Sequence, residues 1–230
     1  MREIVLDTET TGFDPLNGDR LVEIGCVELF NHVATGRTYH QYINPERDMP
    51  EAAFRVHGLS TEFLSSKPVM AEIASDFLDF IGNDQLVIHN APFDMGFLNA
   101  ELKRLGMPAL KNPVLDTVVL ARKRFPGAAA SLDALCRRFE IDNSNRTLHG
   151  ALLDAQLLAE VYLELLGGRQ PDLVLATAVQ NGSGPIARTV RPRREPRPHA
   201  PSSEELVAHE AFLKSFKTPP LWFSLDKPVE

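Results

Sequence analysis

The chain has 230 residues, of which 43% are hydrophobic, and this is enough for one folded domain with a core and a smaller additional segment. Its formal net charge of −7 excludes a strongly basic protein that coats nucleic acid. An acidic protein can still act on nucleic acid if bound metal cations supply positive charge locally.

The cysteines and the N-terminal sequence indicate the cellular setting. Cys26 and Cys136 each lie within an apolar pattern, so we expect buried core residues rather than a disulfide or a zinc site. The sequence begins without the pattern of a signal peptide, and no apolar run is long enough to span a bilayer. We therefore expect a reducing, cytoplasmic setting.

The first part of the chain is predicted to form a sheet. Residues 3–7 form a short apolar strand, and the β-branched and aromatic residues of 20–30 and 37–43 are typical of two more strands. Residues 31–36 are predicted to form the turn between them. Because the three strands follow one another closely, we expect an antiparallel meander.

Helices alternate with one strand in the rest of the folded part. Apolar residues recur there at helical spacing, and Gly or Pro marks most of the predicted ends. The predicted helices are residues 69–81, 91–106, 116–125, 131–139 and 150–168, and the predicted strand is residues 85–89. The order of elements predicts an α/β fold class.

The composition changes after Gly168. Residues 169–198 contain six arginines, two acidic residues and several prolines and glycines, and such a composition cannot bury a core. We therefore predict a folded domain over 1–168 and a flexible basic linker over 177–201. A short helix is expected at 202–216, because its first residues fit a capping box.

The first candidate site residues are Asp7 and Glu9 at the end of the first strand. Because side chains alternate along a strand, both point to the same side while Thr8 points away. Two carboxylates that face one spot repel each other, and a divalent cation between them relieves the repulsion. Oxygen ligands favour Mg²⁺ or Mn²⁺ over zinc. For this motif alone, a solvated strand end that begins a polar loop is the alternative.

Two more acidic residues are predicted to face inward from helices. Asp94 lies in the first turn of its helix and shares an apolar stripe with Phe97 and Leu98. A favourable interaction with the helix N-terminus would also explain an acidic residue there. Asp154 lies on the apolar stripe of the last predicted helix of the domain, where a charge is costly unless it is paired or bound to metal.

His149 lies just before the same helix, five residues from Asp154. A lone histidine at such a place is usually an ordinary loop residue, but beside a metal cluster it is a candidate general base. Four inward carboxylates and a histidine at the ends of three elements suit a two-metal phosphodiester site, with ions about 3.5–4 Å apart.

Three motifs carry a resemblance to a known family. The stretches LDTETTG (6–12), HNAPFD (89–94) and HGALLDA (149–155) resemble, in order and spacing, the exonuclease motifs of the DEDDh family of 3′–5′ exonucleases. The similarity covers residues 3–168 nearly continuously. It implies a ribonuclease-H-like mixed sheet flanked by helices, with a flexible C-terminal tail. The implied activity is metal-dependent 3′–5′ removal of mispaired nucleotides from DNA 3′ ends, as the proofreading subunit of a replicative polymerase.

The resemblance also implies the roles of the site residues. The implied catalytic residues are Asp7, Glu9, Asp94, His149 and Asp154. Asp7, Glu9 and Asp154 would hold two Mg²⁺ or Mn²⁺ ions and contact the substrate, with Asp7 bridging both ions. Asp94 would hold the site through a metal-bound water, and His149 would take the proton from the attacking water.

The same resemblance implies that His57, in the stretch VHGL (56–59), and the backbone of Thr10 contact the 3′-terminal nucleotide. An RNA-directed member of the family, of the ribonuclease T or oligoribonuclease type, nearly shares the catalytic motifs, so an exoribonuclease stays open. A scaffold that bridges polymerase and clamp is a further alternative. The linker and the aromatic tail favour the replicative exonuclease, because the RNA-directed enzymes are generally a bare domain.

Two segments of the tail are predicted to bind partners. Gln170, Leu173 and Leu175, within residues 169–176, resemble the peptide that bacterial replication proteins insert into the sliding clamp (beta), although such short motifs also arise by chance. Residues 202–230 carry many large apolar side chains, which could fold back on the domain or anchor a partner. The resemblance implies the alpha subunit of DNA polymerase III as that partner.

Overall fold

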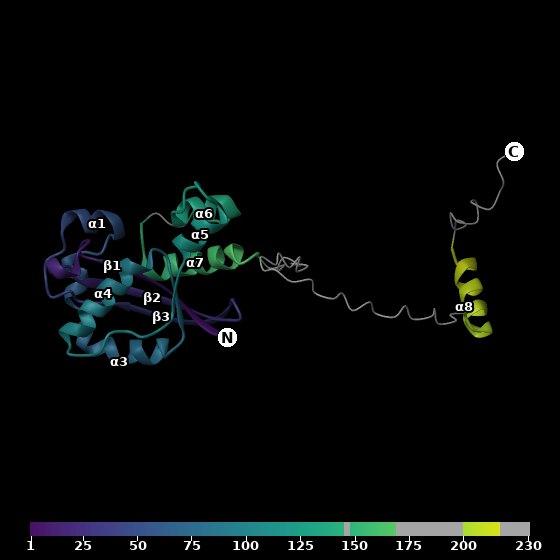
Figure 1. Ribbon diagram of the computed structural model, residues 1–230, viewed down its shortest axis with the longest axis horizontal. Helices are drawn as coiled ribbons and strands as arrows, with labels where there is room; N and C mark the ends of the chain where they lie inside the picture. The colour runs from purple at the N-terminus through teal and green to yellow at the C-terminus, as the bar shows by residue number, and fades with distance from the viewer. Residues whose placement is uncertain (145–147, 169–199, 217–230) are drawn as a thin grey trace, which may run out of the picture. The chain divides into compact units, whose positions relative to one another are not determined.

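The computed structural model describes residues 1–144, 148–168 and 200–216, which belong to two units that are taken separately below. In the first unit, five strands form one mixed sheet in the order β3-β2-β1-β4-β5. Figure 1 labels β1, β2 and β3 of this sheet. The strands are β1 (Arg2–Thr10), β2 (Leu21–Phe30), β3 (Val33–Tyr42), β4 (Gln85–Ile88) and β5 (Val114–Asp116). The first three are antiparallel, and β4 and β5 run parallel to β1. The predicted mixed sheet with an antiparallel meander is confirmed.

Helices cover both faces of this sheet. They are α1 (Glu51–His57), α2 (Thr61–Ser65), α3 (Met70–Ile81), α4 (Ala91–Arg104), α5 (Thr117–Arg124), α6 (Leu132–Phe139) and α7 (Ala151–Leu165), with a short 3-10 helix η1 (Pro15–Asn17) after β1. On one face Phe77 of α3 and Phe97 of α4 join a core cluster with Leu6 of β1. On the other face Leu158 of α7 packs in a cluster with Val5, alongside residues of α5 and α6 (Figure 1). Each predicted helix of the domain is present, shorter by a few residues at its ends.

The predicted turn at residues 31–36 is wrong. β2 continues to Phe30 and β3 begins at Val33, so only Asn31 and His32 connect them. Both residues have positive φ angles, 51° and 67°, as a two-residue type I′ hairpin turn requires. The first half of β3 is exposed, so it lacks the apolar alternation that marks a half-buried strand. The three-residue strand β5 was not predicted, because so short a segment shows no periodicity.

Helix α7 lies against the sheet at Gly25 of β2. A Cβ atom at Gly25 would lie 2.3 Å from the backbone of Ala151 and Leu152, in the first turn of α7. Gly25 is also the partner of Asp7 in the register of β1 and β2. The missing side chain therefore allows the first turn of α7, which carries Asp154, to approach the strand pair that carries Asp7.

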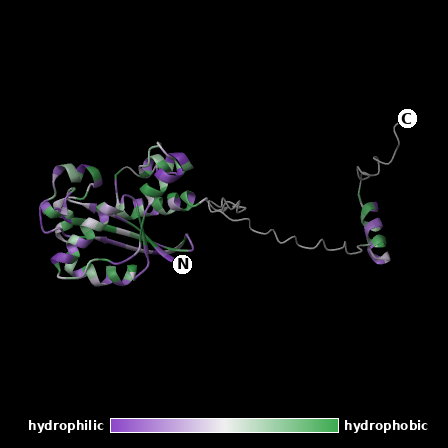
Figure 2. Cartoon of the chain, viewed as in Figure 1, coloured by the Kyte–Doolittle hydropathy of each residue, from purple (hydrophilic) through white to green (hydrophobic). Residues whose placement is uncertain are grey.

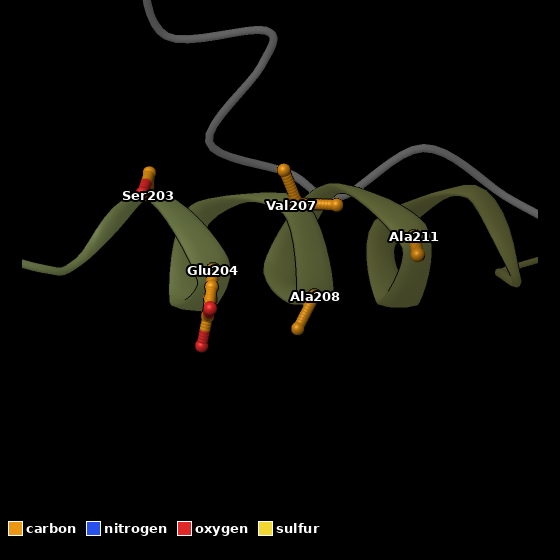
Figure 3. A pocket seen from close by; sticks show the side chains of 5 residues that line it. All are labelled: Ser203, Glu204, Val207, Ala208 and Ala211. Atoms are coloured by element: carbon orange, nitrogen blue, oxygen red, sulfur yellow. The ribbon is translucent and has the colours of Figure 1, made fainter.

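The second unit contains one described helix, α8 (Ser203–Lys214), which begins with the predicted capping box of Ser202 and Glu205. Figure 2 shows hydrophobic and hydrophilic residues alternating along α8, and Figure 3 shows some of its side chains, among them Val207. Leu206, Val207 and Phe212 are exposed. Outside the described residues lie Gln170, Leu173, Leu175, nearly all of the predicted linker and the last part of the tail. Within the described ranges, no helix has the length and apolarity needed to cross a membrane.

Gly25→Ala is expected to lower the free energy of unfolding by about 3 kcal/mol. The added methyl group would clash with backbone atoms of α7, which can move only if the helix shifts away from the sheet. Urea denaturation followed by circular dichroism measures this change. Gly96→Ala in α4 is the matched control, because nothing lies within 4 Å of its added Cβ. Removing that helical glycine is expected to raise stability by about 0.5–1 kcal/mol. Unchanged stability of Gly25→Ala would contradict the close approach of α7.

Candidate active site

Three elements bring the predicted catalytic side chains to one cavity. Asp7 and Glu9 come from the end of β1, the central strand of the sheet. Asp94 comes from the first turn of α4 and Asp154 from the first turn of α7. All four, together with His149, line one cavity of about 290 Å³. The cavity lies where β1 and its parallel neighbour β4 end, which is where open α/β sheets commonly place ligands.

Three of the acidic side chains of this cavity are deeply buried, and Asp7 is half-buried. Glu9 is 8% exposed, Asp94 is 3% exposed and Asp154 is 2% exposed. The predicted inward orientation of the two helix carboxylates is therefore confirmed. Burial of several like charges in one place is costly unless protons or cations compensate them.

Asp94 shows this cost most clearly. Burial, the largest cause, raises the pKa of Asp94 to about 7, and the negative charge of Asp116 acts in the same direction. The hydroxyl of Thr8 opposes the shift by donating a hydrogen bond of 2.7 Å to the Asp94 carboxylate. The sequence predicted only that Thr8 points away from Asp7 and Glu9, and nothing in the pattern identified Asp94 as its partner.

His149 and Asp154 lie close together at the N-terminal end of α7. His149 Nδ1 lies 3.2 Å from Asp154 Oδ2, and the backbone N–H of His149 donates to the carbonyl of Val56 at 3.1 Å. Three possible ligand atoms, one from each of Glu9, His149 and Asp154, lie within 4.8 Å of one another. They are close enough to hold one cation. Two of the three expected metal ligands thus come together with His149, and Asp7 lines the same cavity outside this group.

His57, which was expected to contact the 3′-terminal nucleotide with the backbone of Thr10, lies near Thr10 and His149. Burial, the largest cause, lowers the pKa of His57, a positive charge on His149 lowers it further, and the backbone of Thr10 opposes the shift. His57 Nδ1 accepts a hydrogen bond of 3.1 Å from the Leu59 N–H. Burial and the hydrogen bond accepted at Nδ1 therefore favour the neutral form of the ring.

Several residues that line the cavity were not predicted. They are Thr8, His89, Phe93, Ser131, Leu132 and Asp133. His89 follows β4 within a motif that was noticed for Asp94, and its Nδ1 lies 2.9 Å from the hydroxyl of Thr117. Ser131 caps the N-terminus of α6 by accepting from the Ala134 N–H, and this turn brings α6 to the cavity. The capping sequence predicts a helix start, but not which cavity the start would face.

A family comparison matches this architecture. The sequence model described as Exonuclease (RNase T) matches residues 4–162, which include every predicted catalytic residue. The chain belongs to this exonuclease family. The family membership expected from the three motifs is thereby confirmed.

Relatives of the exonuclease extend the similarity beyond the domain. DNA polymerase III subunit epsilon of Rickettsia felis is 52% identical over 221 residues, which are 94% of this chain and 96% of that protein. The protein of the same name from Escherichia coli is 48% identical over 224 residues, 92% of each chain. Among solved structures, Exonuclease X in complex with 5′-overhanging duplex DNA has a TM-score of 0.59 at 23% identity, over 71% of this chain and 90% of that one. This structural likeness supports the fold.

Asp94→Asn is expected to stabilise the metal-free protein at pH 8. The Asp94 carboxyl stays protonated in the folded state up to about pH 7, so its contribution to stability is lost as the pH rises from about 4 through 7. Asparagine keeps an oxygen that can accept from Thr8 and carries no charge. Thermal denaturation with a chelator measures the effect, and wild type and variant should differ little at pH 4. A variant that is less stable than wild type at pH 8 would contradict the burial of a charge at this position.

Proposed function

We propose that this exonuclease acts in the 3′–5′ direction and removes mispaired nucleotides from DNA 3′ ends as the proofreading subunit of a replicative polymerase. The observation that carries the proposal is the burial of Glu9, Asp94 and Asp154 around one cavity, with His149 against Asp154. The close relatives named as subunits of DNA polymerase III support the replicative setting.

The residues of the cavity fit divalent cations. Buried carboxylates whose charges repel one another, one of them with a pKa raised to about 7, form an anionic cage that a cation relieves. Asp7, Glu9 and Asp154 are the proposed ligands, and their oxygen atoms suit two Mg²⁺ or Mn²⁺ ions. Such ions, when bound, activate water and offset the negative charge of the phosphodiester.

The side chains around the cage have distinct proposed roles. A neutral His149 that donates from Nδ1 to Asp154 carries its lone pair on Nε2, where it can accept the proton of the attacking water. Asp94 completes the anionic cage and is held in place by Thr8. His57 and the backbone of Thr10 position the 3′-terminal nucleotide. A frayed end suits such a site, because a mispaired base is easier to unpair.

A degradation assay tests this function. DNA duplexes with a matched or a mismatched 3′ end, and RNA of the same sequence, are incubated with the chain and Mg²⁺ after labelling at the 5′ end. The proposal predicts stepwise shortening from the 3′ end, faster for mismatched DNA and slow for RNA, and complete loss with a chelator. Equal or faster degradation of RNA would favour the exoribonuclease, and no degradation would favour a scaffold.

His149→Ala provides the matched variant for this assay. It is expected to bind DNA as wild type does but to lose about 10²–10⁴-fold of the rate, since general base catalysis typically contributes that much. Binding is measured by fluorescence anisotropy with Ca²⁺ in place of Mg²⁺. A rate close to that of wild type at neutral pH would show that His149 is not the general base.

We further propose that the tail connects the exonuclease to its partners. In this proposal Gln170, Leu173 and Leu175 of residues 169–176 bind the sliding clamp, residues 177–201 form the linker and residues 202–230 bind the polymerase alpha subunit. The exposed apolar side chains of α8 support a binding role for the last segment, because aromatic and aliphatic anchors often carry the affinity of an interface.

Ending the chain after residue 176 is expected to leave hydrolysis of free single strands unchanged and to abolish co-elution with the polymerase subunit. Size-exclusion chromatography of the two purified proteins measures the complex. Gln170→Ala in the full chain is the control, because it should weaken clamp binding and leave the polymerase complex intact. Co-elution of the truncated chain with the polymerase subunit would assign the contact to the exonuclease domain instead.

A further inference from the structure

Helices α5 and α6 expose a group of cations that no described ion pair explains. Arg122 and Lys123 lie in the last turn of α5, and Arg137 and Arg138 lie in the last turn of α6; all four are exposed. These four residues are called the basic surface below. None of them forms an ion pair with any other residue in the part of the chain that the structure describes.

The C-terminal ends of the two helices lie close together, which brings the two helix turns that carry the four cations near each other. The rings of Phe125 and Phe139 lie 5.9 Å apart, and the guanidinium of Arg138 lies 4.5 Å from the centre of the Phe125 ring. The neighbouring Arg124 is used differently, because it donates to the last carbonyl groups of α7 at 3.1 and 2.6 Å. Arg124 therefore ties α5 to α7 and is not part of the basic surface.

Other arginines of the domain are paired with acids. Examples are the pairs Arg20–Glu101, Arg47–Asp19 and Arg55–Glu51. The dipole of a helix favours a cation at its C-terminus, which would explain one basic residue on each helix. It does not require two exposed cations on each of two helices whose C-terminal ends lie close together, in a protein whose net charge is −7.

Helix α6 connects the basic surface with the catalytic cavity. Ser131, Leu132 and Asp133, at the start of α6, line that cavity. At a rise of 1.5 Å per residue, Arg137 lies about 8 Å along the helix from Leu132. A nucleic acid strand that leaves the cavity along α6 would therefore reach the basic surface within one or two nucleotides of its end.

We infer that the basic surface binds the phosphate backbone of the DNA strand on the 5′ side of the nucleotide that is removed. The inference rests on the proposed exonuclease function. The cavity itself is lined by carboxylates, so it repels the phosphates of the strand other than the one that is hydrolysed. Cations placed outside the cavity supply affinity for the rest of the strand and leave the charge balance of the reaction unchanged.

Two double variants test the basic surface, Arg122→Gln with Lys123→Gln and Arg137→Gln with Arg138→Gln. The substrates are a long oligothymidylate, which reaches the basic surface, and the dinucleotide pTpT, which has no strand beyond the cavity. Each double variant is expected to raise KM for the long strand about tenfold and to leave its kcat unchanged. The slope of log KM against log salt concentration should fall by about 0.7 for each phosphate that the variant no longer neutralises. Hydrolysis of pTpT should match wild type.

Lys103→Gln with Lys111→Gln is the matched control, because it removes two exposed lysines that the structure places at the far end of α4 and in the following loop. This variant should keep the KM and the salt slope of wild type. If both double variants keep them too while pTpT is hydrolysed, the inference is overturned and the exonuclease function stands. If wild type hydrolyses neither substrate, the proposed function fails, and the inference fails with it. Loss of the polymerase complex without any change in KM would assign the surface to a protein and overturn the inference.

Discussion

The close contact between α7 and β2 at Gly25 determines where the catalytic groups meet. Only a residue without a side chain lets the backbone of Ala151 and Leu152 come this near to a strand. The contact places the first turn of α7 over the register pair of Gly25 and Asp7. Asp154 then joins the carboxylates of β1, although about 145 residues of sequence separate the two elements. The site is thus a consequence of one packing distance between a helix and a sheet.

The electrostatic cost of this arrangement explains its chemistry. Glu9, Asp94 and Asp154 are all buried around one cavity, and burial raises the pKa of Asp94, so the charged, metal-free site is destabilised. Divalent cations that bind there offset this electrostatic cost. The positions of the carboxylates therefore favour metal binding. An acidic protein can thereby attract an anionic phosphodiester, and the exposed cations of α5 and α6 can interact with the rest of the strand at a distance from the reaction.

The sequence predicts the carboxylates well because their signals are local. Alternation along β1 places Asp7 and Glu9 on one side, and the apolar stripes of α4 and α7 turn Asp94 and Asp154 inward. The contact between Thr8 and Asp94 could not be predicted, since it depends on how α4 approaches β1. The same holds for the residues of α6 that line the cavity, whose capping sequence marks a helix start without fixing its position.

The outer parts of the sheet were the least predictable. The exposed half of β3 shows no apolar alternation, and a turn that needs only two residues with positive φ was predicted to be six residues long. The close approach of α7 has no local signal either, because a glycine within a strand indicates a bulge as readily as a packing contact. In each case a contact between distant segments decides the structure, and such contacts produce no periodic pattern of apolar residues in the sequence.

The central claim is that buried carboxylates from three elements form a cage for the cations of phosphodiester hydrolysis. The most direct measurement is anomalous diffraction from crystals of the exonuclease grown with Mn²⁺ and thymidine 5′-monophosphate. We expect two manganese peaks about 3.5–4 Å apart, in contact with Asp7, Glu9 and Asp154, with the nucleotide phosphate beside them. Crystals that show the nucleotide in the cavity without manganese, or manganese bound only elsewhere, would contradict this claim.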